Sequence, residues 1–548
     1  MAPSSKTVYV DEDVGKDDGS ADGTESAPYK TLLHAHIANP PLPDEKAEYL
    51  TRKSVTGPVS EDGDPSARLV WKPATKSALK KVANLYEQHK KKAAKEKDLA
   101  IREKEESENR RAALEEAKKV VITQDSKLPK AVKITLNEKD PKLVKLRSGT
   151  SRKDGDHSEG KGTRVRVTGR VHRLRSQKDV VFVTLQDGYG FLQCVLTGDL
   201  VKTYDALTLT METSMTIYGE MWEVPPKQHA PDDRELHADY FEIIGKAAGD
   251  KEAITTRVAP DADPQTLYDN RHLVLRGENS AAVMKVRAAV LRAFRQTYEE
   301  LKPSCLEVTP PSMVQTQVEG GATLFAFDYY GEQAYLTQSS QLYLETCLPS
   351  LGNVFCVAPS FRAEKSLTRR HLSEYTHVEA ELDFVAFDDL LEHLELVMCR
   401  VIDVVMANPL IAKYVKELNP HFSPPERPFM RMTYADAIDW LRDHDILNED
   451  GQPHAFGDDI AEAAERKMTD VIDRPIFLTH FPVEVKAFYM KKDPSDLRVT
   501  ESVDCLMPGV GEIVGGSMRM DDYDELLAAY KREGIDPAPY YWYTDQRK

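Results

Sequence analysis

Alternating apolar and polar positions between residues 163 and 247 predict a series of short β-strands. The alternating apolar positions are Val165, Val167, Val171, Val181, Val183 and Leu185. A turn signal, Asp187-Gly188, follows them, and Phe191, Cys194 and Val195 continue the pattern. Several short strands in so compact a segment indicate a small β-barrel.

Helical periodicity replaces this alternation in two other parts of the chain. Residues 281–301 carry apolar positions at helical spacing, which predicts an amphipathic helix. Residues 76–119 are rich in Lys, Glu and Ala and contain no Gly or Pro, so we expect a long exposed helix. This helix is either a solvated linker or an RNA contact made by Lys80-Lys81 and Lys90-Lys91-Lys92.

These patterns divide the chain into parts. The expected parts are an N-terminal α/β unit at 1–75, a charged helix at 76–119, a linker at 120–162, the barrel at 163–247, a hinge at 248–280 and a large α+β domain at 281–548. The chain of 548 residues is long enough for such a multidomain α+β organisation.

Composition and charge narrow the classes of protein. The net charge of −17 does not suggest a nucleic-acid binder, although a local basic face can still bind RNA. The six cysteines show no CxxC spacing and lie mostly in apolar runs, so we expect reduced thiols and a cytoplasmic protein. An acidic N-terminus without an apolar run argues against a targeting segment, and no apolar run reaches 18 residues, so we expect no membrane association.

Candidate chemistry centres on residues 354–384. A short apolar run from Val354 to Val357 and an alternating run after Tyr375 predict two antiparallel strands, joined by a basic loop. Arg362 lies at the end of the first strand, where a rigid element can aim its guanidinium at a phosphate. The sequence therefore predicts a polyphosphate site.

This stretch resembles motif 2 of the class II aminoacyl-tRNA synthetases, through Phe361, Arg362, Glu364, His371 and Tyr375. The resemblance implies that Arg362 binds the ATP α-phosphate and the amino-acid carboxylate, and that Glu364 contacts the adenine amino group. It also implies that His371, beside Arg370 in the basic loop, approaches the γ-phosphate and that Tyr375 stacks on adenine. Arg362 and His371 are the expected catalytic residues, and Arg370 is included in the expected ATP site.

Other segments extend the resemblance. The helix at 281–301, followed by a strand that stops at Pro310-Pro311, looks like class II motif 1, which implies a homodimer through residues 281–311. Residues 163–247 are similar to the OB-fold anticodon-binding domain of class IIb synthetases. That similarity implies that Phe182 and Gln193 read an anticodon base, with positive charge from Arg173 and Arg175, although a core role for Phe182 stays open.

The resembling family also suggests an amino-acid site. The Gly-rich segment at 317–322 would be a mobile lid in which Glu319 holds the substrate ammonium, or else a tight turn. Ser339 and Gln341 would also face the amino acid. Aspartyl enzymes carry Lys at the position of Leu344. The absence of a lysine here removes a partner for the side-chain carboxylate of aspartate.

Glu379 and Arg519 would complete that site by accepting from and donating to a side-chain amide. This pair, with no Lys, resembles the asparaginyl enzymes, and the N-terminal unit resembles the extension of the eukaryotic members. Asp504 and Glu512, around a Gly-rich run whose spacing is wrong for a dinucleotide fingerprint, would hold Mg²⁺ against ATP unless they are ordinary surface acids.

The expected function is thus attachment of asparagine to tRNA(Asn) through asparaginyl adenylate. The chain stops at Lys548 without the family's motif 3, so we expect reduced activity. Two alternatives remain: a non-catalytic tRNA-binding or regulatory protein, and an aspartyl-tRNA synthetase.

Overall fold

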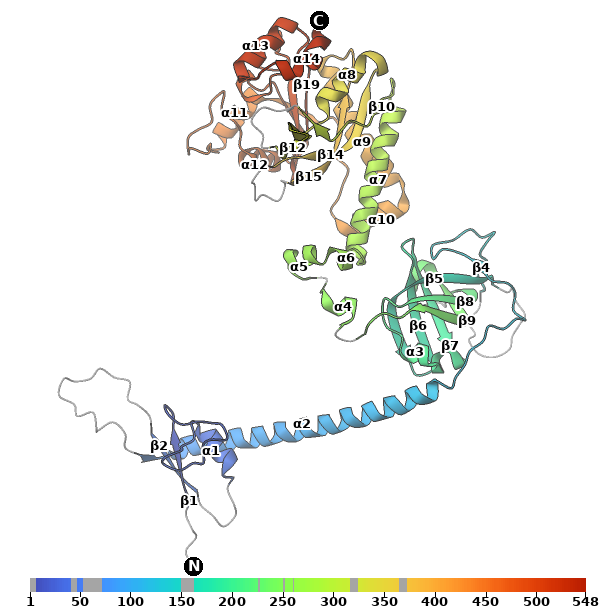
Figure 1. Ribbon diagram of the computed structural model, residues 1–548, viewed down its shortest axis with the longest axis vertical. Helices are drawn as coiled ribbons and strands as arrows, with labels where there is room; N and C mark the ends of the chain where they lie inside the picture. The colour runs from blue at the N-terminus through green and yellow to red at the C-terminus, as the bar shows by residue number, and fades with distance from the viewer. Residues whose placement is uncertain are drawn as a thin grey trace, which may run out of the picture. The chain divides into compact units, whose positions relative to one another are not determined.

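Figure 1 shows the computed structural model of the chain. The residues that it describes are 6–40, 47–52, 71–148, 162–224, 227–249, 252–259, 261–315, 324–363 and 372–548. Contacts divide the chain into two compact units, residues 1–257 and residues 258–548. Each unit has its own hydrophobic cores, so we describe each by itself.

The first unit begins with a small α/β layer. Its elements are β1 (Lys6–Asp11), α1 (Leu32–Ala38), β2 (Ala47–Arg52) and β3 (Lys72–Pro73). β1 and β2 run parallel, with Val8 opposite Tyr49, and β3 joins β2 in the antiparallel direction. Val8, Val10 and Tyr49 from the strands and Ala35 from the helix form a buried core. Strands and a helix are therefore present where the sequence predicts an N-terminal α/β unit.

The charged helix expected over 76–119 is α2 (Lys76–Ala117). Thr75 caps its first turn, because its side chain accepts a hydrogen bond from the backbone N–H of Ala78. Leu79 packs against the N-terminal core and Ala117 is buried at the other end. Apolar residues thus hold both ends of the helix.

A six-stranded β-barrel follows this helix. Its elements are β4 (Val132–Lys133), β5 (Arg164–Gln177), β6 (Val180–Gln186), β7 (Phe191–Thr197), α3 (Tyr204–Leu207), β8 (Ser214–Glu223) and β9 (Arg234–Gly245). The strand order is β4-β5-β6-β7-β9-β8, and pairing of β5 with β8 closes the sheet on itself. The barrel agrees with the expected OB-fold. Gly188, with a φ of 89°, makes the turn between β6 and β7, where Asp187 accepts hydrogen bonds from two backbone N–H groups.

The barrel core corrects one boundary. Leu136 and Val144 are buried among the barrel residues, although the sequence assigns them to a linker at 120–162. Part of that linker therefore belongs to the barrel, because β4 pairs with β5 and brings these apolar side chains inward. Charged residues lie near both positions in the sequence, so the local pattern does not indicate that they are buried.

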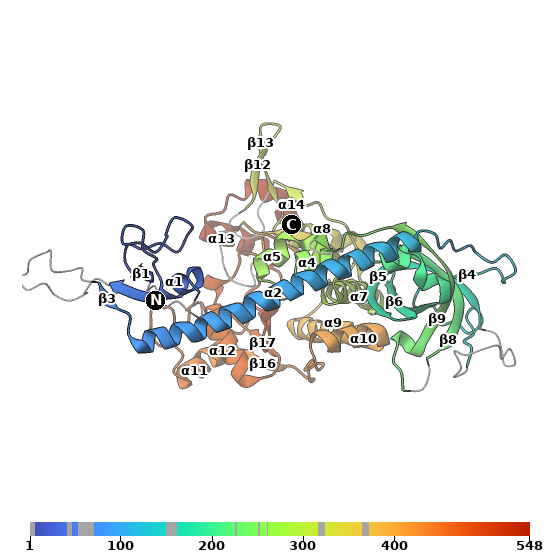
Figure 2. The ribbon, with the colours of Figure 1, turned by 90° about the horizontal axis from the view of Figure 1, so that it is seen from below.

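The second unit contains two mixed sheets and a projecting hairpin, covered by helices. Its strands are β10 (Leu306–Glu307), β11 (Met313–Val314), β12 (Ala326–Tyr329), β13 (Glu332–Leu336), β14 (Val354–Phe361), β15 (Glu374–Glu381), β16 (Met430–Thr433), β17 (Ile476–Thr479), β18 (Ser502–Met507) and β19 (Gly511–Ser517). The sheet orders are β10-β14-β15, β16-β17-β18-β19 and β11-β13-β12. β10 lies parallel to β14 and β16 lies parallel to β17, so the expected antiparallel sheet also contains parallel pairs. Figure 2 shows the β12–β13 hairpin projecting from the rest of the unit.

The same unit contains helices. They are α5 (Pro264–Asp269), α6 (Arg271–Val274), α7 (Glu278–Glu300), α8 (Gln341–Leu351), α9 (Phe387–Ala407), α10 (Pro409–Leu418), α11 (Tyr434–Asp443), α12 (Glu462–Ile472), α13 (Tyr523–Glu533) and α14 (Tyr541–Thr544). The helix expected over 281–301 is α7, which starts three residues earlier, at Glu278. Tyr298 of α7 stacks on Phe355 of β14 at 4.5 Å between ring centres. The helical pattern thus places an aromatic face on the sheet.

The region expected as a hinge at 248–280 is not an extended linker. In its described residues it forms three short helices, α4 (Ile254–Arg257), α5 and α6, and the start of α7. All six cysteines are free thiols, as expected. In the part of the chain that the structure describes, no helix combines the length and apolar character that a bilayer crossing requires.

Candidate active site

Strand pairing fixes the basic end of the site. β14 and β15 are antiparallel, with Ser360 opposite Tyr375. Arg362, directly after β14, donates its backbone N–H to the carbonyl of Ser373 at 3.0 Å. Its guanidinium carbon lies 5.7 Å from the centre of the Tyr375 ring. Arg362 and Tyr375 are thus brought together, as the motif predicts.

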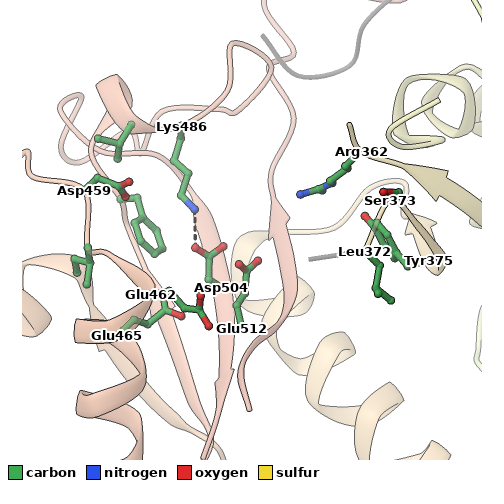
Figure 3. A pocket seen from close by; sticks show the side chains of 13 residues that line it. Arg362, Leu372, Ser373, Tyr375, Asp459, Glu462, Glu465, Lys486, Asp504 and Glu512 are labelled. Carbon is green, nitrogen blue, oxygen red and sulfur yellow. Dashed lines mark hydrogen bonds and ion pairs between the residues drawn. The ribbon is translucent and has the colours of Figure 1, made fainter. Parts of the chain in front are cut away.

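A cavity of about 500 Å³ opens beside this pair (Figure 3). Arg362 and Tyr375 line one side of it, and the facing side carries Asp504, Glu512 and Lys486. The cavity is within the range that ligand sites occupy.

The cavity wall is mostly acidic. Among the described residues its charged side chains are Asp459, Glu462, Glu465, Asp504, Glu512, Arg362 and Lys486, so five carboxylates face two cations. A polyphosphate that carries a divalent cation meets less repulsion from these acids than the bare anion does.

The two acids expected to bind Mg²⁺ converge on one glycine. Asp504 in β18 is opposite Gly515 in β19. A Cβ atom at Gly515 would lie 3.1 Å from Glu512 Oε1 and 3.6 Å from Asp504 Oδ1, so Glu512 crowds that position and Asp504 lies at ordinary contact distance from it. Among the described residues no group of three or more His, Cys, Asp or Glu could hold a metal ion. Mg²⁺ commonly uses one or two carboxylates and takes its other ligands from water and phosphate, so this pair fits that ion.

Lys486 is a further cation at the same corner. Its Nζ donates a hydrogen bond to Asp504 Oδ2 at 2.6 Å and lies 3.8 Å from the centre of the Phe481 ring. The ammonium group neutralises one carboxylate of the pair. No feature of the sequence singles out Lys486, because its partner is 18 positions away and no motif contains it.

A second polar cluster surrounds Glu379 of β15. Its Oε1 accepts a hydrogen bond from Ser339 Oγ, and both of its carboxylate oxygens lie within 3.1 Å of the backbone nitrogen of Ser340. Ser339 Oγ in turn accepts from the backbone N–H of Gln341 at 3.1 Å. Glu379 thus sits at the N-terminus of α8, where the helix dipole favours a negative charge. Three residues expected in the amino-acid site, Ser339, Gln341 and Glu379, are together.

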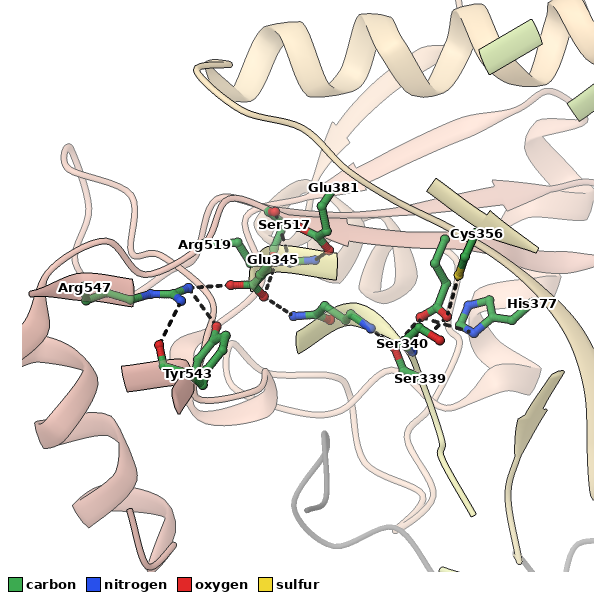
Figure 4. Close-up of polar contacts among 12 residues, drawn as sticks. Ser339, Ser340, Glu345, Cys356, His377, Glu381, Ser517, Arg519, Tyr543 and Arg547 are labelled. Carbon is green, nitrogen blue, oxygen red and sulfur yellow. Dashed lines mark hydrogen bonds and ion pairs between the residues drawn. The ribbon is translucent and has the colours of Figure 1, made fainter. Parts of the chain in front are cut away.

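Arg519, also expected there, lies in a buried network of charges (Figure 4). It donates to Glu381 Oε1 at 2.6 Å, and its Nε lies 3.2 Å from Glu345 Oε1. Burial raises the pKa of the Glu381 carboxyl to about 7, while the Arg519 guanidinium opposes that rise. Burial lowers the pKa of the Arg519 guanidinium, but the carboxylates of Glu381 and Glu345 outweigh burial and hold that pKa above its usual value.

Some expected residues are not in these clusters. Leu344 is fully buried with Val354 and Cys356, so it packs in the core beside the amino-acid cluster. The four remaining expected contacts, Glu319, Glu364, Arg370 and His371, lie outside the described residues. Their roles stay predictions, as does the expectation about motif 3.

Family comparisons match all three parts of the chain. Residues 263–548 match the model "tRNA synthetases class II (D, K and N)", residues 24–129 match the asparaginyl-tRNA synthetase N-terminal domain, and residues 165–244 match the OB-fold nucleic acid binding domain. A Saccharomyces cerevisiae protein named "Asparagine--tRNA ligase, cytoplasmic" is 49% identical over 99% of this chain and 92% of its own length. The Homo sapiens protein of the same name is 47% identical, with the same coverage of both chains.

The chain belongs to the class II asparagine–tRNA ligases.

A solved structure of this family carries the reaction intermediate. Asparaginyl-tRNA synthetase from Entamoeba histolytica in complex with asparaginyl-adenylate is 45% identical, with a TM-score of 0.66, and the match covers 72% of this chain and 89% of that one. The similarity to asparagine–tRNA ligases agrees with the expected family, fold class and substrate amino acid.

The barrel of this asparagine–tRNA ligase carries the expected anticodon residues. Phe182 in β6 is opposite Arg175 in β5, whose guanidinium carbon lies 4.4 Å from the centre of the ring. Gln193 in β7 donates from Nε2 to Glu235 Oε2 at 2.9 Å. Arg173 is exposed on β5 and belongs to the same strand as Arg175. These residues gather on three neighbouring strands of the barrel, β5, β6 and β7.

Sequence reasoning missed several charged residues near the site of this ligase. They are Glu345, Glu381, Lys486, Arg547 and the cavity acids Asp459, Glu462 and Glu465. Glu381 had a usable signal, because it is two positions after Glu379 on the same strand and therefore on the same face. Glu345 had a weaker one, because no other residue of α8 is charged.

Proposed function

We propose that the cavity beside Arg362 binds ATP and that the cluster around Glu379 and Arg519 binds asparagine. The observation that carries this assignment is the arrangement of Arg362 and Tyr375 on paired strands, facing Asp504 and Glu512 across one cavity. As an asparagine–tRNA ligase, the chain joins asparagine to tRNA(Asn) through asparaginyl adenylate. The named relatives are cytoplasmic, and we expect the same location for this protein.

The first step joins the amino acid to AMP. The asparagine carboxylate attacks the α-phosphorus of ATP, the bond to the β-phosphate oxygen breaks, and pyrophosphate leaves. Arg362 would hold the α-phosphate through its paired N–H groups and stabilise the charge that develops there. Tyr375 would stack on the adenine ring. No side chain acts as a nucleophile, so positioning and charge supply the catalysis.

The side chain of asparagine would be read by two groups. The Glu379 carboxylate would accept from the amide NH₂, and Arg519 would donate to the amide oxygen. Leu344, packed in the core nearby, would offer no cation to a competing carboxylate. In the second step a ribose hydroxyl of the tRNA terminus attacks the carbonyl carbon and AMP leaves.

Asp504 and Glu512 would hold Mg²⁺. The support is the convergence of both carboxylates over Gly515 and the excess of acids in the cavity wall. The ion would supply positive charge to the ATP phosphates.

We also propose a homodimer through α7 and β10. β10 is the edge strand of its sheet, and Leu306 on it is 51% exposed. Val283 and Met284 at the start of α7 are about half exposed as well. Burial of these apolar residues against a second copy would stabilise the assembly. Replacement of Val283 and Met284 by Glu should halve the mass measured by light scattering, whereas an unchanged mass would place the dimer interface elsewhere.

Amino-acid-dependent exchange of pyrophosphate into ATP tests the main assignment. The wild-type chain should exchange with asparagine and hardly with aspartate. Arg362→Lys should lower kcat, because a single ammonium group cannot replace the paired N–H groups of Arg. Equal exchange with both amino acids would contradict the proposed amino-acid site, and full kcat in Arg362→Lys would contradict the proposed ATP site.

A further inference from the structure

Glu345 is a buried acid that no expected role uses. It lies on α8 and is 5% exposed. Its Oε1 accepts a hydrogen bond from Gln341 Nε2 at 3.1 Å and lies 3.2 Å from Arg519 Nε, and its Oε2 accepts from Arg547. One carboxylate therefore contacts two guanidinium groups and a residue of the proposed amino-acid site.

The hydrogen bonds of Arg519 do not use all of its guanidinium N–H groups. Its Nη1 donates to the carbonyl oxygen and the hydroxyl of Ser517, at 3.2 and 2.5 Å, and its Nη2 donates to Glu381. Its Nε is buried and, despite its closeness to Glu345, makes no hydrogen bond of acceptable geometry within the described residues. A guanidinium has five N–H donors, so one N–H of Nη2 remains that can serve the oxygen of an amide.

The charges around Arg519 are nearly balanced. Among the described residues this cluster contains the carboxylates of Glu345, Glu379 and Glu381 and the guanidinium groups of Arg519 and Arg547, an excess of one negative charge when all are ionised. Glu345 and Glu381 are less than 10% exposed, so water screens this charge weakly. A carboxamide adds no charge to such a site, whereas a carboxylate adds a second uncompensated one.

We propose that Glu345 determines amino-acid specificity by acting through Arg519. It neutralises the Arg519 guanidinium and fixes it beside Gln341, so that the site accepts a carboxamide and rejects a carboxylate. Glu345 is a positioning residue, because it touches Arg519 and Gln341 rather than the substrate. The inference rests on the proposed asparagine site.

The test compares asparagine with aspartate in pyrophosphate exchange by the full chain. In Glu345→Gln, which keeps the shape of the side chain but removes its charge, the ratio of kcat/KM for asparagine to that for aspartate should fall by about tenfold or more. Without the charge of Glu345 the Arg519 guanidinium is no longer neutralised and favours the side-chain carboxylate of aspartate. The KM for ATP should not change. If kcat/KM falls equally for both amino acids, the ratio is unchanged and Glu345 is merely structural.

Two matched variants keep the test decisive if Glu345→Gln does not fold. Glu345→Asp retains the charge but shortens the side chain, so kcat/KM for asparagine should fall while the ratio stays within about threefold. Arg547→Gln leaves the charge of Glu345 to Arg519 alone, so the ratio should be kept or raised. A shift toward aspartate in either variant would overturn the proposal.

The wild-type chain separates this inference from the proposed function. A wild type that does not prefer asparagine refutes the asparagine site and the role of Glu345 together. A selective wild type beside an equally selective, folded Glu345→Gln refutes only the role of Glu345.

Discussion

Replacement of Phe182 tests whether the barrel binds an unstacked base. Phe182 lies between Val181 and Val183, which belong to the barrel core, so its side chain is on the opposite face of β6. The ring is 8% exposed, and Arg175 covers it at 4.4 Å. A cation therefore covers one face of a ring that lies outside the barrel core.

The magnitude follows from what covers the ring. A cation over an aromatic ring contributes about 0.5–1 kcal/mol at exposed sites and about 2 kcal/mol or more when desolvated, and a stacked base contributes about 1–3 kcal/mol, so a base can replace Arg175 at little net cost. Phe182→Ala should weaken tRNA(Asn) binding by about 1–3 kcal/mol, which is a rise of roughly 5- to 150-fold in Kd. Phe182→Leu should lose most of the same affinity, because it keeps apolar volume without a π-face.

Filter binding of a tRNA(Asn) transcript at fixed salt gives both Kd values, since salt alone changes the affinity strongly. Asparagine-dependent pyrophosphate exchange without tRNA is the control and should be unchanged. Unaltered affinity in both variants would mean that no base stacks on Phe182. A parallel loss of exchange would instead point to a general defect in folding.

Three further substitutions test the catalytic unit. Glu379→Ala should lower kcat/KM for asparagine by roughly 10- to 150-fold, the value of a hydrogen bond to a charged group, and unchanged exchange would remove Glu379 from the amino-acid site. Gly515→Ala should raise the Mg²⁺ concentration needed for half-maximal exchange, because the new Cβ lies 3.1 Å from Glu512 Oε1. Gly516→Ala is the matched control, because its new Cβ meets only ordinary contacts. Equal Mg²⁺ requirements in the two variants would contradict the metal site. Leu526→Ala, at a fully buried position, should lower the free energy of unfolding by about 2–5 kcal/mol in a denaturant titration, and a loss below 1 kcal/mol would show that the core can collapse around the cavity.

Local patterns predicted the elements that present one face to a core. The alternation around Val181 and the helical spacing in 281–301 gave β6 and α7 within a few residues of their bounds. The run after Tyr375 likewise gave β15, which places Glu379 opposite Cys356. Patterns of this kind survive in the sequence because burial repeats with the period of the element.

The same reasoning failed where burial does not repeat. Leu136 and Val144 are single apolar residues among charged neighbours, and only their contact with the barrel shows that they are core residues. The charge network of Arg519 was also invisible, because Glu345 and Arg547 are 202 positions apart. Contacts between distant segments leave no local period, so a motif can identify one member of such a network but not its partners.

Local charge, rather than net charge, connects these findings to function. The net charge of −17 argues against a nucleic-acid binder, yet Arg173 and Arg175 give the barrel a basic strand beside Phe182. Among the described residues of the catalytic unit, carboxylates outnumber cations both in the cavity wall and around Arg519. An acidic excess selects against bare anions, so it favours a phosphate that arrives with a metal ion in one place and a neutral amide in the other. The same electrostatic principle would thus apply to both subsites. A raised Mg²⁺ requirement in Gly515→Ala together with an unchanged amino-acid ratio in Glu345→Gln would restrict it to the ATP cavity.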